Sequence, residues 1–388
     1  MSSIVIQGDT SGSITVEAPS VAGTHTLTLP KATGNIATDA TVGLGMKNRI
    51  INGNMVIDQR NGGASVTQSS ASNLYTVDRW QVAGTVNAAF TAQQSSTVPD
   101  NFVKSLVLTS SASTSPAASD FFGLIHKVEG YNFADLGFGT SAAKTITLSF
   151  WVRSSVTGTF TGTLNNSSAG RCFPFSYTIS SANTWEQKSI TVAGDTTGTW
   201  LTTNGLGVQI FFALGGGSNW KEPAGSWTST LCLMADGQTD WISTSGATFY
   251  ITGVQLEQSD NATPFENRMY GTELALCQRY FYKSYGQDTG AVPVTSSGWL
   301  GSRHAIAYSV ADLGCDVRYP VPMRTTPTVT IYHQDGTSSA VYEIITGAKK
   351  AVGGTLYGND SGFWHLNSSS LFTTNYHYYF QITASAEL

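Results

Sequence analysis

The feature that most constrains the fold is a set of short segments in which apolar and polar residues alternate. The segment KTITLSFWVRS places apolar side chains at every second position: Ile146, Leu148, Phe150 and Val152. The segment LGVQIFFAL repeats this pattern at Leu206, Val208, Ile210, Phe212 and Leu214. Because neighbouring side chains of a strand point to opposite faces, a period of two indicates a half-buried strand. Many such segments between Gly, Ser and Asn turns predict an antiparallel β-sandwich.

The closing strand of this sandwich, within TFYITGVQLEQ, changes its apolar register. Phe249 and Ile251 have odd numbers, whereas Val254 and Leu256 have even numbers. One extra residue in a strand shifts the alternation in this way, and glycine is suited to that position. We therefore predict a β-bulge at Gly253.

Size and charge narrow the class of protein. A chain of 388 residues is too long for one ordinary core, so we expect two or three domains. Charged residues make up 12% of the chain, against about 25% in typical domains, which favours a secreted or particle-bound β protein. The net charge of −5 and the absence of a basic cluster argue against nucleic-acid binding. We also expect no membrane insertion and no signal peptide, because no long apolar run and no basic leader occur.

The pattern divides the chain into four parts, and the predicted fold class is all-β with one short helix. Residues 1–47 alternate around Ile14, Val16 and Ala18, and again in THTLTLP, but contain too few large apolar residues to fold alone. We expect an oligomerising β stem there, with several copies around a threefold axis. Residues 48–270 are expected to form the antiparallel sandwich, 271–286 a connecting helix, and 287–388 a C-terminal β-sandwich tip.

The helix is predicted over about 272–284. Thr272 is placed to cap its beginning. Leu274, Cys277 and Phe281 then share one face at the spacing i, i+3, i+7. An apolar face on a connecting helix needs a neighbour, so we expect these three residues to contact other subunits of a trimer.

Other local predictions concern the start of the sandwich and the cysteines. The segment NRIINGNMVIDQRNGG predicts a strand over Ile50–Ile57 and a turn at Asn61–Gly63. Trp80 and Trp151 lie beside or within strands, which favours core or interface positions. The four cysteines stand far apart without a CxxC motif, which favours four buried free thiols: Cys172, Cys232, Cys277 and Cys315.

Several of these segments together resemble bacteriophage tail-fibre and minor tail structural proteins. They are NRIINGNMVIDQRNGG (48–63), YTVDRW (75–80), GVQLEQSDNATPFENR (253–268) and ELALCQRYFYK (273–283). MRTTP (323–327) is similar to the C-terminal domains of that group, and TLTLPKATGNIAT looks like its virion-attachment stem. The resemblance is strong at the borders of the large module, residues 48–270, and weak within residues 84–245.

This resemblance implies a carbohydrate-binding-module-like jelly roll followed by a helix and a variable tip. It further implies a homotrimer that attaches to a phage tail or baseplate protein through the N-terminal stem. The other end is then expected to bind a host-cell surface glycan or lipopolysaccharide. Such a protein belongs to the virion tail, is assembled in the host cytoplasm and leaves by lysis.

Glycan recognition needs flat aromatic faces together with hydrogen-bonding groups. In the large module, Trp220 and Trp227 occupy the Gly-rich segment GGGSNWKEPAGSW. The alternative there is a loop that folds over the sandwich or contacts another chain. In the tip, the candidates form an aromatic-rich set: Trp364, His365, His377 and Tyr379. The alternative for these residues is an intersubunit contact.

The sequence offers little for metal binding or catalysis. No HxH, HExxH, GxSxG or phosphate-binding loop occurs, so we expect no catalytic residue and no cofactor. Jelly rolls of this type often carry a structural calcium, for which Asp58, Asp78 and Glu257 would be candidates. The favoured alternative pairs Asp78 and Glu257 with Arg79 or backbone donors. Two rival functions remain: a purely structural tail or baseplate component, and a polysaccharide depolymerase.

Overall fold

The computed structural model describes residues 3–7, 13–17, 47–287, 289–290, 303–309, 311–354, 356–367 and 372–388. The chain divides into two compact units, Met1–Leu44 and Gly45–Leu388. In the first unit, strands β1 (Ser3–Gln7) and β2 (Ser13–Glu17) pair antiparallel. Strand β2 lies where the alternation around Ile14 and Val16 predicts one. The strand predicted in THTLTLP lies outside the described residues.

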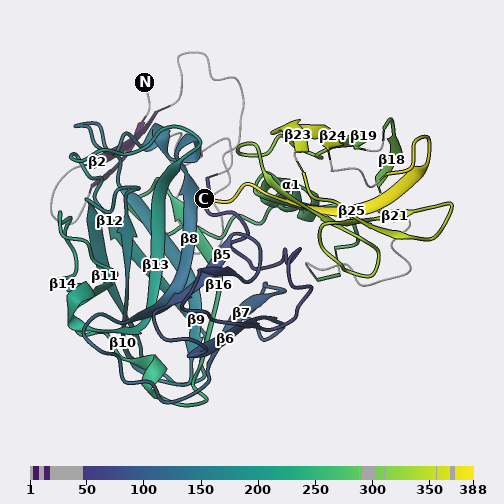
Figure 1. Cartoon of the computed structure of the whole chain (residues 1–388). Coiled ribbons are helices and arrows are strands. Elements are labelled where there is room, and N and C mark those ends of the chain that lie inside the picture. The colour runs from purple at the N-terminus through teal and green to yellow at the C-terminus, as the bar shows by residue number, and fades with distance from the viewer. Residues whose placement is uncertain are drawn as a thin grey trace. The chain divides into compact units, whose positions relative to one another are not determined.

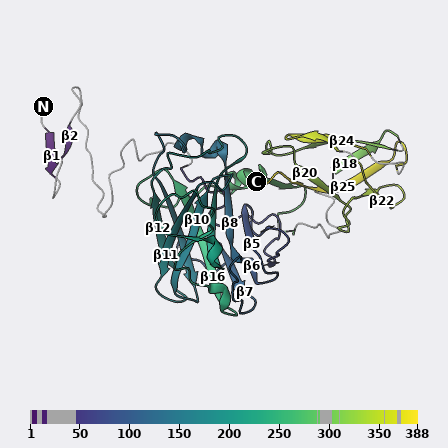
Figure 2. The ribbon, with the colours of Figure 1, turned by 60° about the vertical axis from the view of Figure 1, so that its left-hand side comes forward.

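Residues 48–257 form the predicted sandwich of two six-stranded antiparallel sheets (Figures 1 and 2). The strands of the first sheet, in spatial order, are β11 (Cys172–Ile179), β10 (Gly158–Asn165), β13 (Leu206–Gly216), β8 (Phe121–Glu129), β5 (Trp80–Gly84) and β4 (Leu74–Tyr75). Those of the second sheet are β12 (Glu186–Val192), β9 (Ile146–Ser154), β16 (Thr248–Glu257), β7 (Ser105–Ser110), β6 (Phe90–Ser95) and β3 (Val66–Thr67).

The core lies between the two sheets, where the alternation predicts it. The inward residues of β9 and β13 are buried, among them Phe150 and Phe212, whose ring centroids are 5.0 Å apart. Trp80 is fully buried and lies 4.7 Å from the ring of His126, which confirms its predicted core position. Burial of such large apolar side chains supplies the main stabilising term of the sandwich.

The predicted β-bulge in β16 is confirmed. The pairing of β16 with β9 shifts register between Thr252 and Gln255, and Gly253 has a φ of +62°. A Cβ atom on Gly253 would lie 2.6 Å from the ring of Phe102, so a larger residue would meet both a backbone and a packing penalty. The bulge therefore needs the glycine that the sequence provides.

The segment predicted as the opening strand, Ile50–Ile57, is instead an irregular loop. Asn52 and Met55 adopt the left-handed conformation, with φ values of 59° and 60°, which a strand does not allow. The Asn52 side chain then accepts a hydrogen bond from Ile57 N and donates one to Ile57 O. The apolar residues of this loop are still buried. The hydrogen bonds of the Asn52 side-chain amide take the place of the backbone hydrogen bonds that a neighbouring strand would supply. The predicted turn at Asn61–Gly63 is confirmed.

The outer face of the first sheet is covered by residues 217–238. This segment contains the short elements η3 (Ser218–Trp220), β14 (Lys221–Glu222) and β15 (Met234–Ala235), and β14 pairs with β15 in parallel. Met234 packs against Phe211 and Ile125, whose side chains point outward from the sheet. The alternative in which the Gly-rich loop folds over the sandwich is thus what the structure contains.

One cysteine prediction is wrong. Cys172 at the start of β11 and Cys232 in the covering segment form a disulfide, with their Cα atoms 6.1 Å apart. Sequence spacing does not reveal this pair, since 60 positions separate the two residues. Cys277 is a buried free thiol, as predicted, and Cys315 is a half-buried one.

The helix α1 spans Tyr270–Gln278, so the predicted boundaries need correction. Its N-cap is Met269 rather than Thr272, and no side chain caps it. It ends before Phe281 because Phe281–Lys283 forms strand β17, which pairs with the last strand of the chain. No helix among the described residues combines the length and apolarity that crossing a bilayer requires.

The predicted trimer face of the helix is used within the chain. Cys277 is fully buried beside Ile51 and Ile57, and Phe281 is also buried. Leu274 is half-buried and packs against the same cluster. Cys277 and Phe281 are therefore not available to a second chain, because the loop at the start of the jelly roll covers Cys277 and the Arg60 guanidinium lies over the Phe281 ring.

The C-terminal module is a nine-stranded sheet organised around β25 (Figures 1 and 2). Besides β17 and β25 (His377–Ser385), its strands are β18 (Arg303–Ala307), β19 (Asp312–Arg318), β20 (Thr328–Tyr332), β21 (Ala340–Glu343), β22 (Lys349–Ala351), β23 (Leu356–Asn359) and β24 (Gly362–Asn367). Tyr378, Phe380 and Ile382 are buried, which confirms the alternation predicted for the last strand.

The segments that resemble tail proteins meet in one buried hydrogen-bond network. Asn48 donates to Val254 O, 3.1 Å away, and accepts from Leu256 N. Arg268 donates to Asn48 O and Ile50 O, while Asn52 N donates to a carboxylate oxygen of Glu273. These residues hold the jelly roll, the exit segment and the helix together. Their role in this structure is architectural.

A second buried set joins the last residues of the chain to the sandwich, and we call it the Glu387 clasp. Arg60 and Arg79 both donate to the carboxylate of Glu387, Arg60 across 2.7 Å. The Arg79 guanidinium also lies 3.6 Å from the centre of the Tyr280 ring. Arg324 donates to the Glu387 carbonyl oxygen, 2.7 Å away. The clasp fixes the end of β25 on the sandwich.

Candidate functional site

Four of the six predicted binding residues lie on one face of the C-terminal sheet. Tyr378 and Phe380 point into the core, so His377 and Tyr379 belong to the opposite face. The strand register continues that face through Ile306 of β18, Gly314 of β19, His365 of β24 and Tyr357 of β23. We call this surface the aromatic face: Tyr308, Tyr357, Trp364, His365, His377 and Tyr379.

Trp364 reaches this face because the alternation of β24 is broken. Phe363 and Leu366 are both buried, and the two residues between them, Trp364 and His365, both point away from the core. The pairing of β24 shifts register here against both β19 and β23. Irregularities of this kind re-aim side chains, and they recur at binding sites. The irregularity in β24 places the side chains of two consecutive residues, an indole and an imidazole, on the same surface.

Three aromatic side chains of this face are strongly exposed. Trp364 is 56% exposed, Tyr357 49% and Tyr308 71%. The Tyr308 ring lies over Gly314, and any side chain at position 314 would collide with that ring. Large exposed apolar groups gathered on one surface mark interaction sites. Tyr308 and Tyr357 were not predicted, because only the strand pairing shows that they share a face with Trp364.

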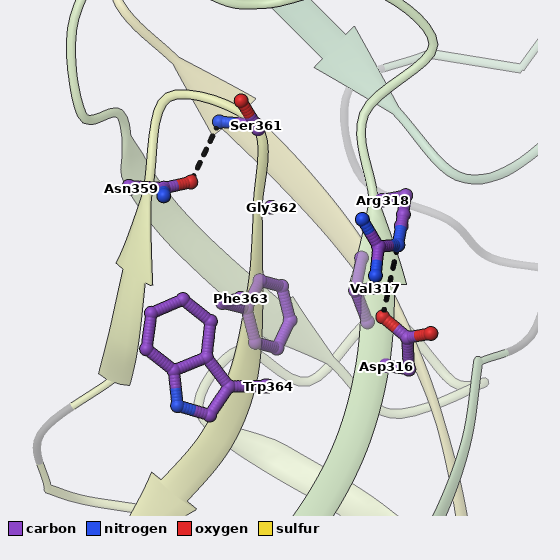
Figure 3. Close-up of a pocket in the computed structure, with 8 residues that line it drawn as sticks. All are labelled: Asp316, Val317, Arg318, Asn359, Ser361, Gly362, Phe363 and Trp364. Carbon is purple, nitrogen blue, oxygen red and sulfur yellow. Dashed lines mark hydrogen bonds and ion pairs between the residues drawn. The ribbon is translucent and has the colours of Figure 1, made fainter.

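Beside Trp364 lies a groove of about 350 Å³ (Figure 3). Figure 3 shows the β23–β24 turn, where Ser361 N donates to the side-chain oxygen of Asn359, 2.9 Å away. Across the groove, Arg318 of β19 pairs with Asp316 at 3.4 Å. The groove thus combines an indole with amide, hydroxyl, guanidinium and carboxylate groups. A ligand that presents both C–H surfaces and hydroxyls can use all of them.

The histidine of the aromatic face is held by a carboxylate. His365 Nε2 lies 3.0 Å from an oxygen of Asp312, and Asn367 donates to the same oxygen. Ser309 donates to the other oxygen across 2.7 Å. Hydrogen bonds from Ser309, His365 and Asn367 lower the pKa of Asp312. The charged carboxylate fixes the imidazole beside Tyr357, whose ring centroid is 5.2 Å away.

The structure places the two remaining candidates, Trp220 and Trp227, in packed positions on the sandwich. The Trp220 ring meets Phe121 edge-on at 5.6 Å, and its N–H donates to Ser119 O. The Trp227 ring meets Trp200 edge-on at 5.5 Å, and its N–H donates to Ala193 O. Both rings are half-buried. Their contacts hold the covering segment in place.

The acidic residues considered for calcium each accept hydrogen bonds within the chain. Asp58 accepts hydrogen bonds from the backbone N–H groups of Asn61 and Gly63, and Glu257 accepts from Thr263 N. Burial raises the pKa of Asp78 to about 7, and one of its oxygens accepts from Gln59 N at 3.0 Å. In the part of the chain that the structure describes, no three His, Cys, Asp or Glu residues are grouped to hold a metal. The backbone-donor alternative is correct for Asp78 and Glu257.

Neither a protein-family model nor a curated protein matches the sequence. Among solved structures, the enzymatically active domain of tailspike protein 4 of bacteriophage CBA120 is 14% identical, with a TM-score of 0.29. That match covers 47% of this chain and 19% of the tailspike chain. The family 11 carbohydrate-binding module of a Clostridium thermocellum cellulase is 10% identical over 52% of this chain and 98% of the module, with a TM-score of 0.26. A xylanase fragment from the same organism, containing a family 22 carbohydrate-binding module, is 13% identical over 50% of this chain and 29% of that chain, with a TM-score of 0.26.

Proposed function

We propose that this protein is a non-catalytic phage tail fibre that binds a bacterial surface glycan through the aromatic face. The observation that carries the proposal is the broken alternation at Trp364, which displays an indole beside His365, Tyr357 and a polar groove. Large exposed apolar side chains gathered on one surface mark interaction sites, so this display favours a partner outside the chain. Sugars offer the required partner surface, because their C–H faces stack on aromatic rings and their hydroxyls bind polar groups.

The groove composition supports adhesion rather than hydrolysis. Its lining includes one carboxylate, Asp316, and that group pairs with Arg318. Glycoside hydrolysis ordinarily uses two carboxyl groups that flank the scissile bond. Incubation of a bound polysaccharide with the protein is therefore expected to release no new reducing ends. Their appearance would favour the depolymerase alternative.

Replacement of Trp364 by alanine tests the binding site. We expect about tenfold weaker binding of the purified protein to an array of bacterial polysaccharides and lipopolysaccharides, which corresponds to about 1.4 kcal/mol. The control is Tyr131→Ala, which removes a ring that is 62% exposed on the sandwich. Both variants are expected to keep the wild-type circular dichroism spectrum, because neither side chain belongs to a core.

Two results would contradict this proposal. Binding by Trp364→Ala at wild-type strength would show that the aromatic face is not the site. Binding to no glycan and to no bacterial strain would favour the alternative of a structural tail or baseplate component.

The assembly forms the second half of the proposal. We place three copies of the chain around the N-terminal stem, which attaches to a tail or baseplate protein of the virion assembled in the host cytoplasm. Support comes from the sequence resemblance and from the strand pair β1–β2, whose ten residues cannot supply a core alone. Several copies also raise the avidity of weak single sites.

Light scattering tests the trimer. The mass measured by light scattering is expected to be about three times that of the 41.2 kDa chain. Deletion of residues 1–44 is expected to leave a monomer, because the helix face that a trimer contact would need is covered within the chain. A monomeric full-length protein would contradict the proposed assembly.

A further inference from the structure

A second pocket, of about 370 Å³, lies on the outer face of the other sheet of the sandwich. In β9, Phe150 and Val152 point into the core. The alternating residues Ser149 and Trp151 therefore face outward. Trp151 is half-buried on the outer face, so of the two predicted positions the core is excluded, and the interface stays a prediction. The pocket forms where the bulge at Gly253 brings β16 next to the 100–102 turn.

Three aromatic rings form the walls of this sandwich pocket: Phe102, Trp151 and Phe265. The centroids of Phe102 and Phe265 are 5.3 Å apart. A Cβ atom on Gly253 would lie 2.6 Å from the Phe102 ring and 3.0 Å from the Trp151 ring. The bulge glycine thus allows the two rings to approach each other over the strand. The pocket therefore depends on Gly253, which has a positive φ.

Five polar side chains line the sandwich pocket. Asp100, Asn101, Gln187 and Asn267 line it, together with the buried Ser149. Within the described residues, the side chains of these five form no hydrogen bond to the rest of the chain. Amide and hydroxyl groups beside aromatic walls are therefore available to a ligand. The two tryptophans of the covering segment offer a contrast, because the side chains of Trp220 and Trp227 each have a backbone partner.

We propose that the sandwich pocket binds a neutral pyranose. Aromatic walls suit the apolar face of a sugar ring, and unpaired amides suit its hydroxyls. The volume is at the lower end of the range of about 300–1,000 Å³ for small-molecule sites, which favours a terminal sugar over a long chain. The lining contains no Lys or Arg and one carboxylate, Asp100, which disfavours acidic sugars. The site is separate from the aromatic face, and the proposal does not depend on binding there.

Saturation-transfer NMR on the full-length protein tests the site. The probes are the methyl glycosides of glucose, galactose, mannose and N-acetylglucosamine, with methyl glucuronide as the acidic control. At least one neutral probe is expected to receive saturation. Trp151→Ala is expected to weaken its binding by tenfold or more, both in the wild-type protein and in a Trp364→Ala background that removes the key ring of the aromatic face. Trp185→Ala is the matched control, because this half-buried tryptophan lies beside the same sheet but outside the pocket lining.

A second variant tests the pocket at a side chain on which the fold does not depend. Gln187→Ala removes an exposed side chain with no internal hydrogen bond, so the fold is retained, and binding is expected to weaken by about two- to tenfold. The proposal is overturned if no neutral probe binds, if binding survives both Trp151→Ala and Gln187→Ala, or if the glucuronide binds best. Loss of the signal in Trp364→Ala alone would assign the sugar to the aromatic face instead.

Discussion

Replacing Glu387 by alanine is expected to lower the free energy of unfolding by about 3–5 kcal/mol. The side chain of Arg79 is 1% exposed and that of Glu387 8%, so the ion pair between them is shielded from water. Removal of the carboxylate leaves the Arg79 charge buried without a counter-ion. The stacking of Arg79 on Tyr280 cannot replace that counter-ion, because a ring face compensates only part of the desolvation.

Urea unfolding followed by tryptophan fluorescence measures this effect. Glu387→Gln is the second variant, because it keeps the shape and hydrogen-bonding capacity of the side chain and removes only its charge. Asp316→Ala breaks a surface ion pair whose partners are 80% and 74% exposed, and it is expected to change stability by less than about 1 kcal/mol. Equal small effects of Glu387→Ala and Asp316→Ala would show that the Glu387 clasp contributes little.

Reduction of the disulfide between Cys172 and Cys232 is expected to lower the free energy of unfolding by about 4 kcal/mol. The cross-link closes a loop of 60 positions, and loop-closure entropy for that length predicts an effect of this size. The disulfide also ties the covering segment to the edge strand β11 of the first sheet. Its loss is expected to loosen residues 217–238 first, since these pack on the outer surface of the sandwich.

The double variant Cys172→Ser/Cys232→Ser, compared with the wild type in the presence and absence of dithiothreitol, measures the contribution. The reductant is expected to shift the urea midpoint of the wild type toward that of the double variant and to leave the variant unchanged. Cys315→Ser is the control, because Cys315 is a free thiol. A wild-type midpoint that does not respond to full reduction would contradict the prediction.

The strands of the core were predictable because they depend on local pattern. The alternation of β9 and β13 and the register change at Gly253 each follow from the side-chain period of a strand. The odd numbering of His377 and Tyr379 placed both residues on the face opposite the core for the same reason. Such features need no knowledge of which strands are neighbours.

Features that depend on pairing between distant segments were not predictable. Tyr308 and Tyr357 join the aromatic face only through the neighbours of β19 and β24. The apolar run Ile50–Ile57 has a strand-like composition, but the side chain of Asn52 and its left-handed backbone override that preference. Trp220 and Trp227 stood out because tryptophan in a Gly-rich loop is unusual, and packing accounts for both.

The Glu387 clasp also has a consequence for exchanging parts between related proteins. A tip grafted onto this jelly roll, or this tip moved to another one, separates Arg79 from Glu387 unless both partners travel together. Strand β17 follows the helix yet pairs with β25, so a cut after the helix removes an edge of the tip sheet as well. A chimera made at 286/287 would contain an unpaired buried arginine and an open strand edge. Junctions placed before Gly45, where the second compact unit begins, avoid both problems.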